Sequence, residues 1–311
     1  MDRLEHDNEF YSAHIAAGYI GMIEQTSITP VQTGLQDINQ PNYVDAAYAR
    51  ANAGFGGGVG IFNLMGIAKP VNNTYAMFDR LVGKLDFPRT GNPFIKAASS
   101  VGKDRMAIVL TNFVPSDRMV DFKAFQVNMT AEERALVESY MRTYLGTNGG
   151  TMSNGTYSAQ VASMRQAYAI LDAIDLTLYP PALQKYKDNI GRALSAVDQM
   201  AQQLESASSV ALNVADLPAG RWAVRHYVVD KDHANAFTNR QLWQGDLATA
   251  VANGNRARIA GIVDSANTQT GLESGLTQSD VWQVQAPNAQ TLAFEMAPYS
   301  VHLIEMVRTG N

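Results

Sequence analysis

Short apolar runs from residue 106 onward have the pattern of β-strands. Met106–Asn112 reads MAIVLTN and Trp222–Val229 reads WAVRHYVV, two runs rich in β-branched and aromatic residues. Shorter runs bounded by proline and asparagine follow at Val281–Val284, Thr291–Met296 and Ser300–Val307. Such short strands separated by turn residues are typical of a β-sandwich. We expect one over residues 86–129 and 209–311.

The spacing of apolar residues changes between the first two strand patterns. Thr130 is followed three positions later by Glu133, which is the signature of a capping box at a helix start. Apolar residues then recur at intervals of three and four in three runs, Thr130–Leu145, Ser158–Leu178 and Leu183–Leu204. This pattern predicts a helical bundle at residues 130–208, inserted between the strands of the sandwich.

The first 85 residues combine helical and strand patterns. Glu9–Glu24 and Asn72–Lys84 each carry one apolar face at helical spacing, and Ile28–Leu35 is typical of a short strand. Residues 37–60 are rich in asparagine, glycine and alanine, with one helical turn expected at Val44–Arg50. We therefore expect a helix, a strand, a long loop and a second helix here.

Composition narrows the function classes. The 311 residues carry a net charge of −5 and no basic run, which argues against nucleic-acid binding. The absence of cysteine excludes thiolate catalysis, cysteine zinc sites and iron–sulfur clusters, and we expect no cofactor. No apolar run approaches the ~20 residues that span a bilayer. The acidic, polar start MDRLEHDNEF is unlike a signal peptide.

The stretch Gly54–Val71, GFGGGVGIFNLMGIAKPV, has the glycine content of a phosphate loop but not its spacing. A dinucleotide fingerprint starting at Gly54 or Gly56 fails because Val59 or Ile61 stands where its third glycine belongs. A Walker loop fails because Lys69 is followed by proline. We therefore expect a turn, with no helix N-terminus facing a phosphate.

Three motifs in this chain resemble segments of glycoside hydrolase family 39, the β-xylosidase and α-L-iduronidase group. The glycine stretch resembles the end of that family's catalytic barrel, at Phe55, Gly57, Gly58, Gly60, Gly66, Ile67, Lys69 and Pro70. Residues 225–243 (RHYVVD, then His233, Asn235 and Trp243) and residues 297–305 (APYSVHLIE) resemble segments of its β-sandwich. The family has a histidine where Gly56 stands, and residues 130–208 match no part of it.

The resemblance implies an α+β fold in which residues 1–85 are the last βα elements of a (β/α)8 barrel. It implies the C-terminal part of a retaining hydrolase of β-xyloside or uronide-type polysaccharide. Both catalytic carboxylates of the family align before Met1, so no catalytic residue is expected in this chain. Glu9 and Glu24 are expected on the solvated face of a helix. The resemblance also favours an extracellular or periplasmic location.

Four loop residues are candidates for substrate contact. Asp37 lies near the expected C-terminal end of a barrel strand, where barrel active sites form, and Tyr43, Tyr48 and Phe55 are aromatic residues that can stack on sugars. His226 and His233 flank Asp230 and Asp232, but their spacing fits no known metal site, so we expect none. The resemblance instead gives Asp230, His233 and Asn235 a role in holding a loop.

Two kinds of function remain open. In the first, the chain completes a glycosidase, with carbohydrate as substrate and a second polypeptide supplying the rest of the barrel. In the second, the chain is a non-catalytic carbohydrate-binding or self-assembling protein, whose partners are copies of itself.

Overall fold

A computed structural model describes residues 3–26, 46–116, 119, 128–143, 156–215, 217–284 and 290–310. The chain divides into two compact units. The first comprises Met1–Val114 together with Ser206–Asn311, and the second comprises Pro115–Glu205. Each combines its own elements around its own core, and the fold is a mixture of helices and antiparallel sheet.

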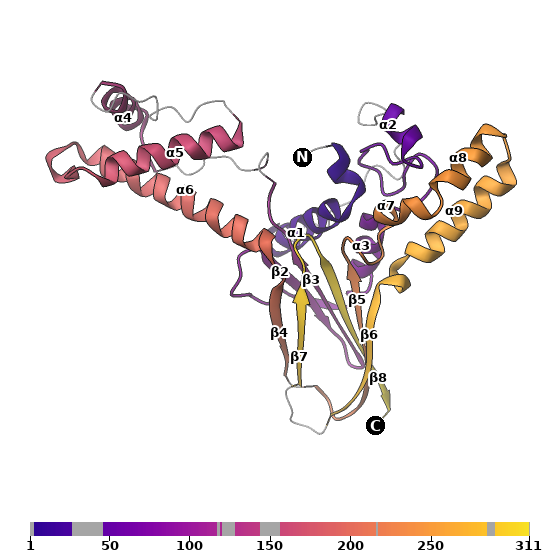
Figure 1. The fold of residues 1–311 in the computed structure, drawn as a ribbon. Coiled ribbons are helices and arrows are strands. Elements are labelled where there is room, and N and C mark those ends of the chain that lie inside the picture. The colour runs from indigo at the N-terminus through magenta and orange to yellow at the C-terminus, as the bar shows by residue number, and fades with distance from the viewer. Residues whose placement is uncertain are drawn as a thin grey trace. The chain divides into compact units, whose positions relative to one another are not determined.

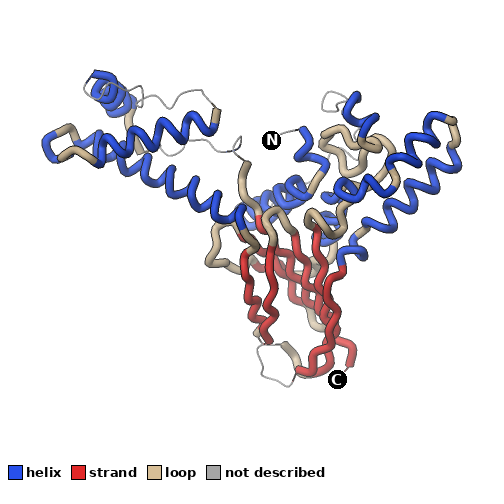
Figure 2. The backbone as a smooth tube through the Cα atoms, in the orientation of Figure 1, coloured by secondary structure: helices blue, strands red, loops and turns tan. Residues whose placement is uncertain are grey.

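A six-stranded antiparallel sheet is the centre of the first unit, within the part of the chain that is described (Figures 1 and 2). Neighbouring strands pair in the order β1-β2-β3-β8-β5-β6. Their bounds are β1 Lys84–Asp86, β2 Ile95–Val101, β3 Arg105–Asn112, β5 Gly220–Val229, β6 Leu276–Val284 and β8 Val301–Gly310. The long pairing of β8 with β3 and β5 joins the C-terminal strand to both halves of the unit.

A second sheet pairs β4 (Ser208–Val214) with β7 (Gln290–Met296). Side chains alternate between the two faces of a strand, so Ile108 and Leu110 of β3 enter the core that this second sheet shares. Trp222, Leu292 and Ile304 belong to the same buried cluster. The two sheets therefore bury one apolar layer between them.

The opposite face of the large sheet is covered by helices α1 (Glu9–Thr26) and α3 (Pro70–Phe78). Ala13 and Ala16 of α1 are fully buried beside Val109 and Leu303. These small side chains bring the helix close to the strands. A short 3-10 helix, η1 (Arg3–Asp7), leads into α1.

The connection from β5 to β6 is helical, which the strand pattern of residues 209–311 did not predict. It contains α7 (Ala236–Asn239), η7 (Arg240–Leu242), α8 (Gln244–Ala252), α9 (Arg256–Thr270) and η8 (Leu272–Gly275). The Asn255 side chain caps α9 by accepting a hydrogen bond from the amide of Arg258. These helices share a core with the glycine stretch and with Ala53, which lies in the turn after α2 (Ala46–Ala51).

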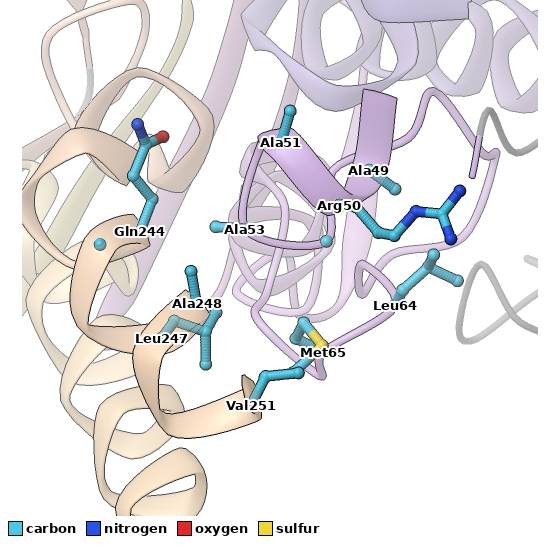
Figure 3. A pocket seen from close by; sticks show the side chains of 12 residues that line it. Ala49, Arg50, Ala51, Ala53, Leu64, Met65, Gln244, Leu247, Ala248 and Val251 are labelled. Carbon is cyan, nitrogen blue, oxygen red and sulfur yellow. The ribbon is translucent and has the colours of Figure 1, made fainter. Parts of the chain in front are cut away.

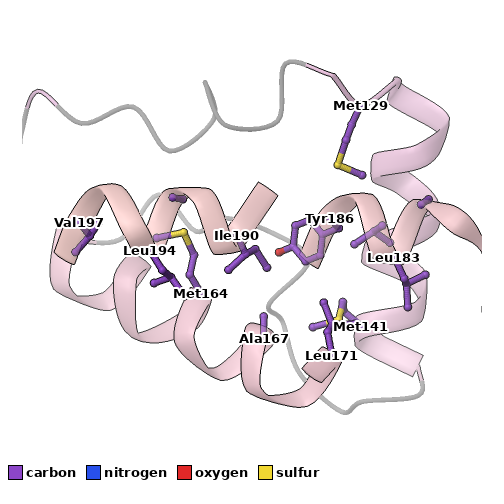
Figure 4. Packing of buried hydrophobic residues seen from close by; sticks show 13 residues of the cluster. Met129, Met141, Met164, Ala167, Leu171, Leu183, Tyr186, Ile190, Leu194 and Val197 are labelled. Carbon is purple, nitrogen blue, oxygen red and sulfur yellow. The ribbon is translucent and has the colours of Figure 1, made fainter. Parts of the chain in front are cut away.

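The described part of the second unit is helical, as the spacing of residues 130–208 predicts. Its elements are α4 (Ala131–Thr143), α5 (Tyr157–Asp172), η6 (Leu176–Leu178) and α6 (Pro181–Glu205). The capping box is present, since the Thr130 amide donates to Glu133 Oε2 at 2.7 Å and the Glu133 amide donates to Thr130 Oγ1 at 3.2 Å. Figure 4 shows the apolar faces of the helices meeting around Leu183, Tyr186 and Ile190.

The five strand patterns and the helix at Glu9–Glu24 are confirmed. The helix expected at Asn72–Lys84 is displaced, since α3 starts at Pro70 and ends at Phe78 before the β1 strand. The strand expected at Ile28–Leu35 lies outside the described residues. The division into 1–85, 86–129 with 209–311, and 130–208 stays a prediction. Among the described helices, none combines the length and apolarity that a bilayer crossing requires.

Candidate functional site

The glycine stretch folds back on itself as a tight irregular hairpin. Phe62 and Ala68 form an antiparallel bridge, and the amide of Asn63 donates to the Ile67 carbonyl at 2.9 Å. The Asn63 side chain holds the turn from inside, because its Oδ1 accepts from the amides of Met65 and Ile67. Its Nδ2 also donates to the Ala53 carbonyl at 3.0 Å. One buried asparagine thus fixes both arms of the hairpin.

A fully buried ion pair joins this hairpin to the start of the chain. Lys69 Nζ lies 2.8 Å from Asp7 Oδ1, and neither side chain is exposed to solvent. Lys69 also donates to the Gly58 carbonyl at 2.5 Å, and the Gly57 amide donates to Asp7 Oδ2 at 2.6 Å. His6 Nδ1 lies 2.9 Å from the Gly57 carbonyl oxygen, and burial lowers the pKa of the imidazole. The Lys69 ammonium group and the Gly57 amide therefore bind the Asp7 carboxylate rather than a phosphate.

The glycines supply backbone shapes that other residues avoid. Gly54, Gly57 and Gly66 have φ values of 92°, 76° and 85°, all in the left-handed region. Helix α3 begins at Pro70, directly after the hairpin. Its first residue is a proline, which has no amide to offer an anion.

Replacing Gly54 by alanine should destabilise the first unit by about 2–3 kcal/mol. The added Cβ would lie 2.6 Å from Met65 Cγ, and alanine is strained at φ +92°. Urea unfolding monitored by circular dichroism measures the loss. Gly18→Ala is the matched control, since its Cβ meets nothing within 4 Å in helix α1 and should be neutral or stabilising. Equal stability of the two variants would contradict the packing described for the hairpin.

An apolar pocket of about 540 Å³ opens beside the hairpin. Its walls come from α2 with the following turn, from Leu64 and Met65 of the hairpin, and from α8. In Figure 3, Arg50 and Leu64 lie at one end and Gln244 at the other, with apolar side chains between them. Those apolar side chains are Ala53, Met65, Leu247, Ala248 and Val251. The sequence pattern did not reveal this pocket, because helix α8 was not predicted.

Of the four candidate sugar-contact residues, Phe55 is the one whose side chain lies among the described residues. Phe55 is 0% exposed and packs edge-on against Phe237, with the ring centroids 5.5 Å apart. Its ring is part of the core in this structure. Tyr48 belongs to helix α2, but its side chain is outside the described residues, as are Asp37 and Tyr43. The contact of these residues with a sugar stays a prediction.

The loop after β5 is held by the residues that the motif comparison singled out. Asp230 Oδ1 accepts hydrogen bonds from the amides of Asp232 and His233 and lies 3.0 Å from His233 Nδ1. Asn235 donates to the Asp230 carbonyl and to Glu9 Oε2, each at 2.9 Å. Glu9 is therefore half-buried and bonded rather than on a solvated face, whereas Glu24 is exposed as expected. The described residues include no group of three ligands suited to a metal ion.

A buried histidine pair in the sheet core was not predicted from the sequence. His226 Nε2 lies 2.8 Å from His302 Nδ1, and His302 Nε2 lies 3.0 Å from Ser300 Oγ. Phe294 packs against both imidazoles. The signal was present, because His226 and His302 occur in two predicted strands, but the pairing of β5 with β8 was needed to bring them together.

Comparison with solved structures returns glycosidases. A family 39 glycoside hydrolase from Xanthomonas axonopodis pv. citri matches with a TM-score of 0.49 at 11% identity, over 98% of this chain and 42% of that chain. The chain resembles part of a family 39 enzyme. A monomeric β-xylosidase from Caulobacter crescentus matches with a TM-score of 0.49 at 15% identity, over 98% of this chain and 42% of that one.

A third similar structure is a bacterial orthologue of human α-L-iduronidase, with a TM-score of 0.46 and 11% identity, over 98% of this chain and 39% of that chain. This chain thus spans about two fifths of the length of the structures it matches. These are members of the family that the sequence motifs resemble. No family model matches the sequence, and no curated protein matches it. At these TM-scores the likeness places no activity or substrate in this chain.

Proposed function

We propose that this chain is the C-terminal part of a retaining glycoside hydrolase that acts on β-xyloside or uronide-type polysaccharide. The catalytic carboxylates belong to a part of the enzyme outside this chain. The observation that carries the proposal is the physical convergence of the three family-like motifs. Segments separated by up to about two hundred residues lie together in one packed body.

The contacts between the motifs are specific. Phe55 of the glycine stretch packs on Phe237 of the second motif, and Arg225–Val229 pairs with Val301–Glu305 of the third motif. Asn73, just after the glycine stretch, donates to the carbonyls of Ala234 and Thr270, each at 2.8 Å. Motifs that resemble one family in order and also contact one another support descent from that family's architecture.

In this proposal residues 1–85 are the terminal βα elements of a barrel, and the two sheets form its companion β-sandwich. The buried apolar layer shared by the two sheets supports the sandwich assignment. Helices α1 and α3, which cover the other face of the large sheet, would join the sandwich to the barrel. Residues 130–208 would be an insertion specific to this chain.

The carboxylates near the glycine stretch support the placement of catalysis elsewhere. Retaining hydrolysis requires two carboxyl groups about 5–5.5 Å apart, one acting as acid and base and the other as nucleophile. Asp7 is buried against Lys69, and Glu9 accepts a hydrogen bond from Asn235. Both groups are engaged in holding the fold, so neither is the acid or the nucleophile in this proposal.

The second candidate function is a non-catalytic, self-associating or carbohydrate-binding protein. Strand β6 favours it, because this nine-residue strand forms an edge of the described sheet. Its side chains Leu276 and Val281 are 39% and 51% exposed. An exposed edge of this length is a template for pairing with another chain.

Native mass spectrometry of the protein from its natural source, with intact masses of the same sample, tests the choice. The glycosidase proposal expects a barrel-sized polypeptide bound to this chain, or a longer chain that contains it. That sample should hydrolyse an aryl β-xyloside or uronide with retention of anomeric configuration, whereas the isolated 311 residues should not. Finding the chain alone, or only copies of it, without hydrolysis would overturn the proposal in favour of the second candidate.

A further inference from the structure

We propose that the pocket between α2, the hairpin and α8 binds an anionic amphiphile, a monomeric medium-chain carboxylate with its head group at Arg50. This site lies in the first unit and is independent of the proposed glycosidase function. Its volume of about 540 Å³ is within the ~300–1,000 Å³ that is typical of small-molecule sites.

The walls of the pocket are fixed before any ligand arrives. The Gly54 amide donates to the Ala49 carbonyl at 2.9 Å, and the Leu64 amide donates to the Gly54 carbonyl at 3.1 Å. Met65 closes over Gly54, where a side chain would collide with it. Because the Asn63 side chain also braces this turn, the hairpin wall of the pocket is held by hydrogen bonds to the backbone.

The lining selects an apolar body. Between the two ends, the pocket presents alanine, leucine, methionine and valine side chains from both walls. Val251 of α8 is 48% exposed, an apolar surface left open to water beside the cavity. A hydrocarbon chain placed here would remove this surface from water, which is favourable by about 25 cal/mol per Å².

Arg50 selects the charge of the head group. Its exposed side chain reaches the end of the pocket beside Leu64 (Figure 3). It has no hydrogen bond or ion pair with any residue in the described part of the chain. A carboxylate at this end would form the paired, charge-assisted hydrogen bonds that a guanidinium fork favours. The opposite end of the pocket has the neutral side chain of Gln244. Only the Arg50 end attracts an anionic head group, which fixes the orientation of the ligand.

Isothermal titration of the purified chain with decanoate below its micelle concentration tests the proposal. We expect one decanoate per chain, weaker binding of 1-decanol, and no saturable binding of decyltrimethylammonium. Arg50→Gln should weaken decanoate binding about tenfold, the loss expected for one charge-assisted contact. Arg89→Gln is the matched control, since Arg89 is an exposed arginine outside the pocket lining, and should bind as the parent does.

Ala248→Phe tests the cavity itself. Ala248 is an exposed position on α8 that lines the pocket, so a phenyl ring should fill the space and abolish saturable binding. Ala248→Leu, with a smaller and better helix-forming side chain, should weaken binding if the phenylalanine variant fails to fold. Equal affinity for the cationic and anionic amphiphiles, an equal effect of Arg89→Gln, or no binding at millimolar decanoate would each overturn the proposal. Saturable binding of an acidic apolar peptide, but not of decanoate, would assign the pocket to a protein partner instead.

Discussion

Replacing Lys69 by methionine should destabilise the first unit by about 3–5 kcal/mol, the cost of leaving a buried charge without its partner. The ammonium group contacts both Asp7 and the Gly58 carbonyl, and neither Lys69 nor Asp7 is reached by solvent. Water cannot take over either contact. Chemical denaturation at neutral pH, followed by far-ultraviolet circular dichroism, measures the change in the free energy of unfolding.

Two further variants separate the buried pair from a general effect of losing a cation. Arg258→Gln removes an ion pair with Asp246 in which both side chains are more than half exposed, and should cost less than about 1 kcal/mol. The double variant Asp7→Asn/Lys69→Met should regain part of the loss, since asparagine is neutral and still accepts the Gly57 hydrogen bond. A Lys69→Met loss no larger than that of Arg258→Gln would contradict the burial of the pair.

Helices and strands could be predicted from the sequence where the apolar or polar character of their residues matches their burial in the fold. Met106–Asn112 and Trp222–Val229 are apolar on both faces, and the structure buries them between two layers. The capping box at Thr130 and the stripes of α5 and α6 are local signals, and the helices formed as expected. Strand β2 was missed because its residues IKAASSV are small and polar, although pairing with β3 and β1 buries most of them.

The candidate site depended on contacts between distant segments, which spacing does not encode. Helix α8 has only two buried residues, Leu247 and Ala250, and its alanine-rich surface gives little periodicity. In the sequence Phe55 is an aromatic residue of a loop, and only its packing against Phe237 in the fold shows that it is buried. Asp7 and Lys69 are separated by more than sixty residues, and neither carries a sequence signature of burial.

Acidification should weaken the first unit through the buried histidine pair. Burial lowers the pKa of His226 from 6.5 to about 4, and burial next to His226 lowers the pKa of His302. The unfolded chain therefore binds more protons than the folded chain below pH 6.5. The stability that the neutral pair contributes is complete above this pH and is lost as the pH falls toward 4. The shift of His226 alone corresponds to about 3 kcal/mol over this window.

Urea unfolding at about pH 7 and about pH 4.5 measures this dependence, and carboxylate titration adds a background common to all variants. In the double variant His226→Leu/His302→Leu, both polar partners are replaced by apolar groups, so stability near neutral pH should change little. Its loss on acidification should be smaller than the parent's by about 2–3 kcal/mol. His233→Gln removes a partly exposed imidazole, which lowers the pKa of His302 less than burial and His226 do, so this variant should retain most of the parent's pH dependence. If the double variant loses as much stability on acidification as the parent does, protonation of the histidine pair is not the cause of the acid destabilisation.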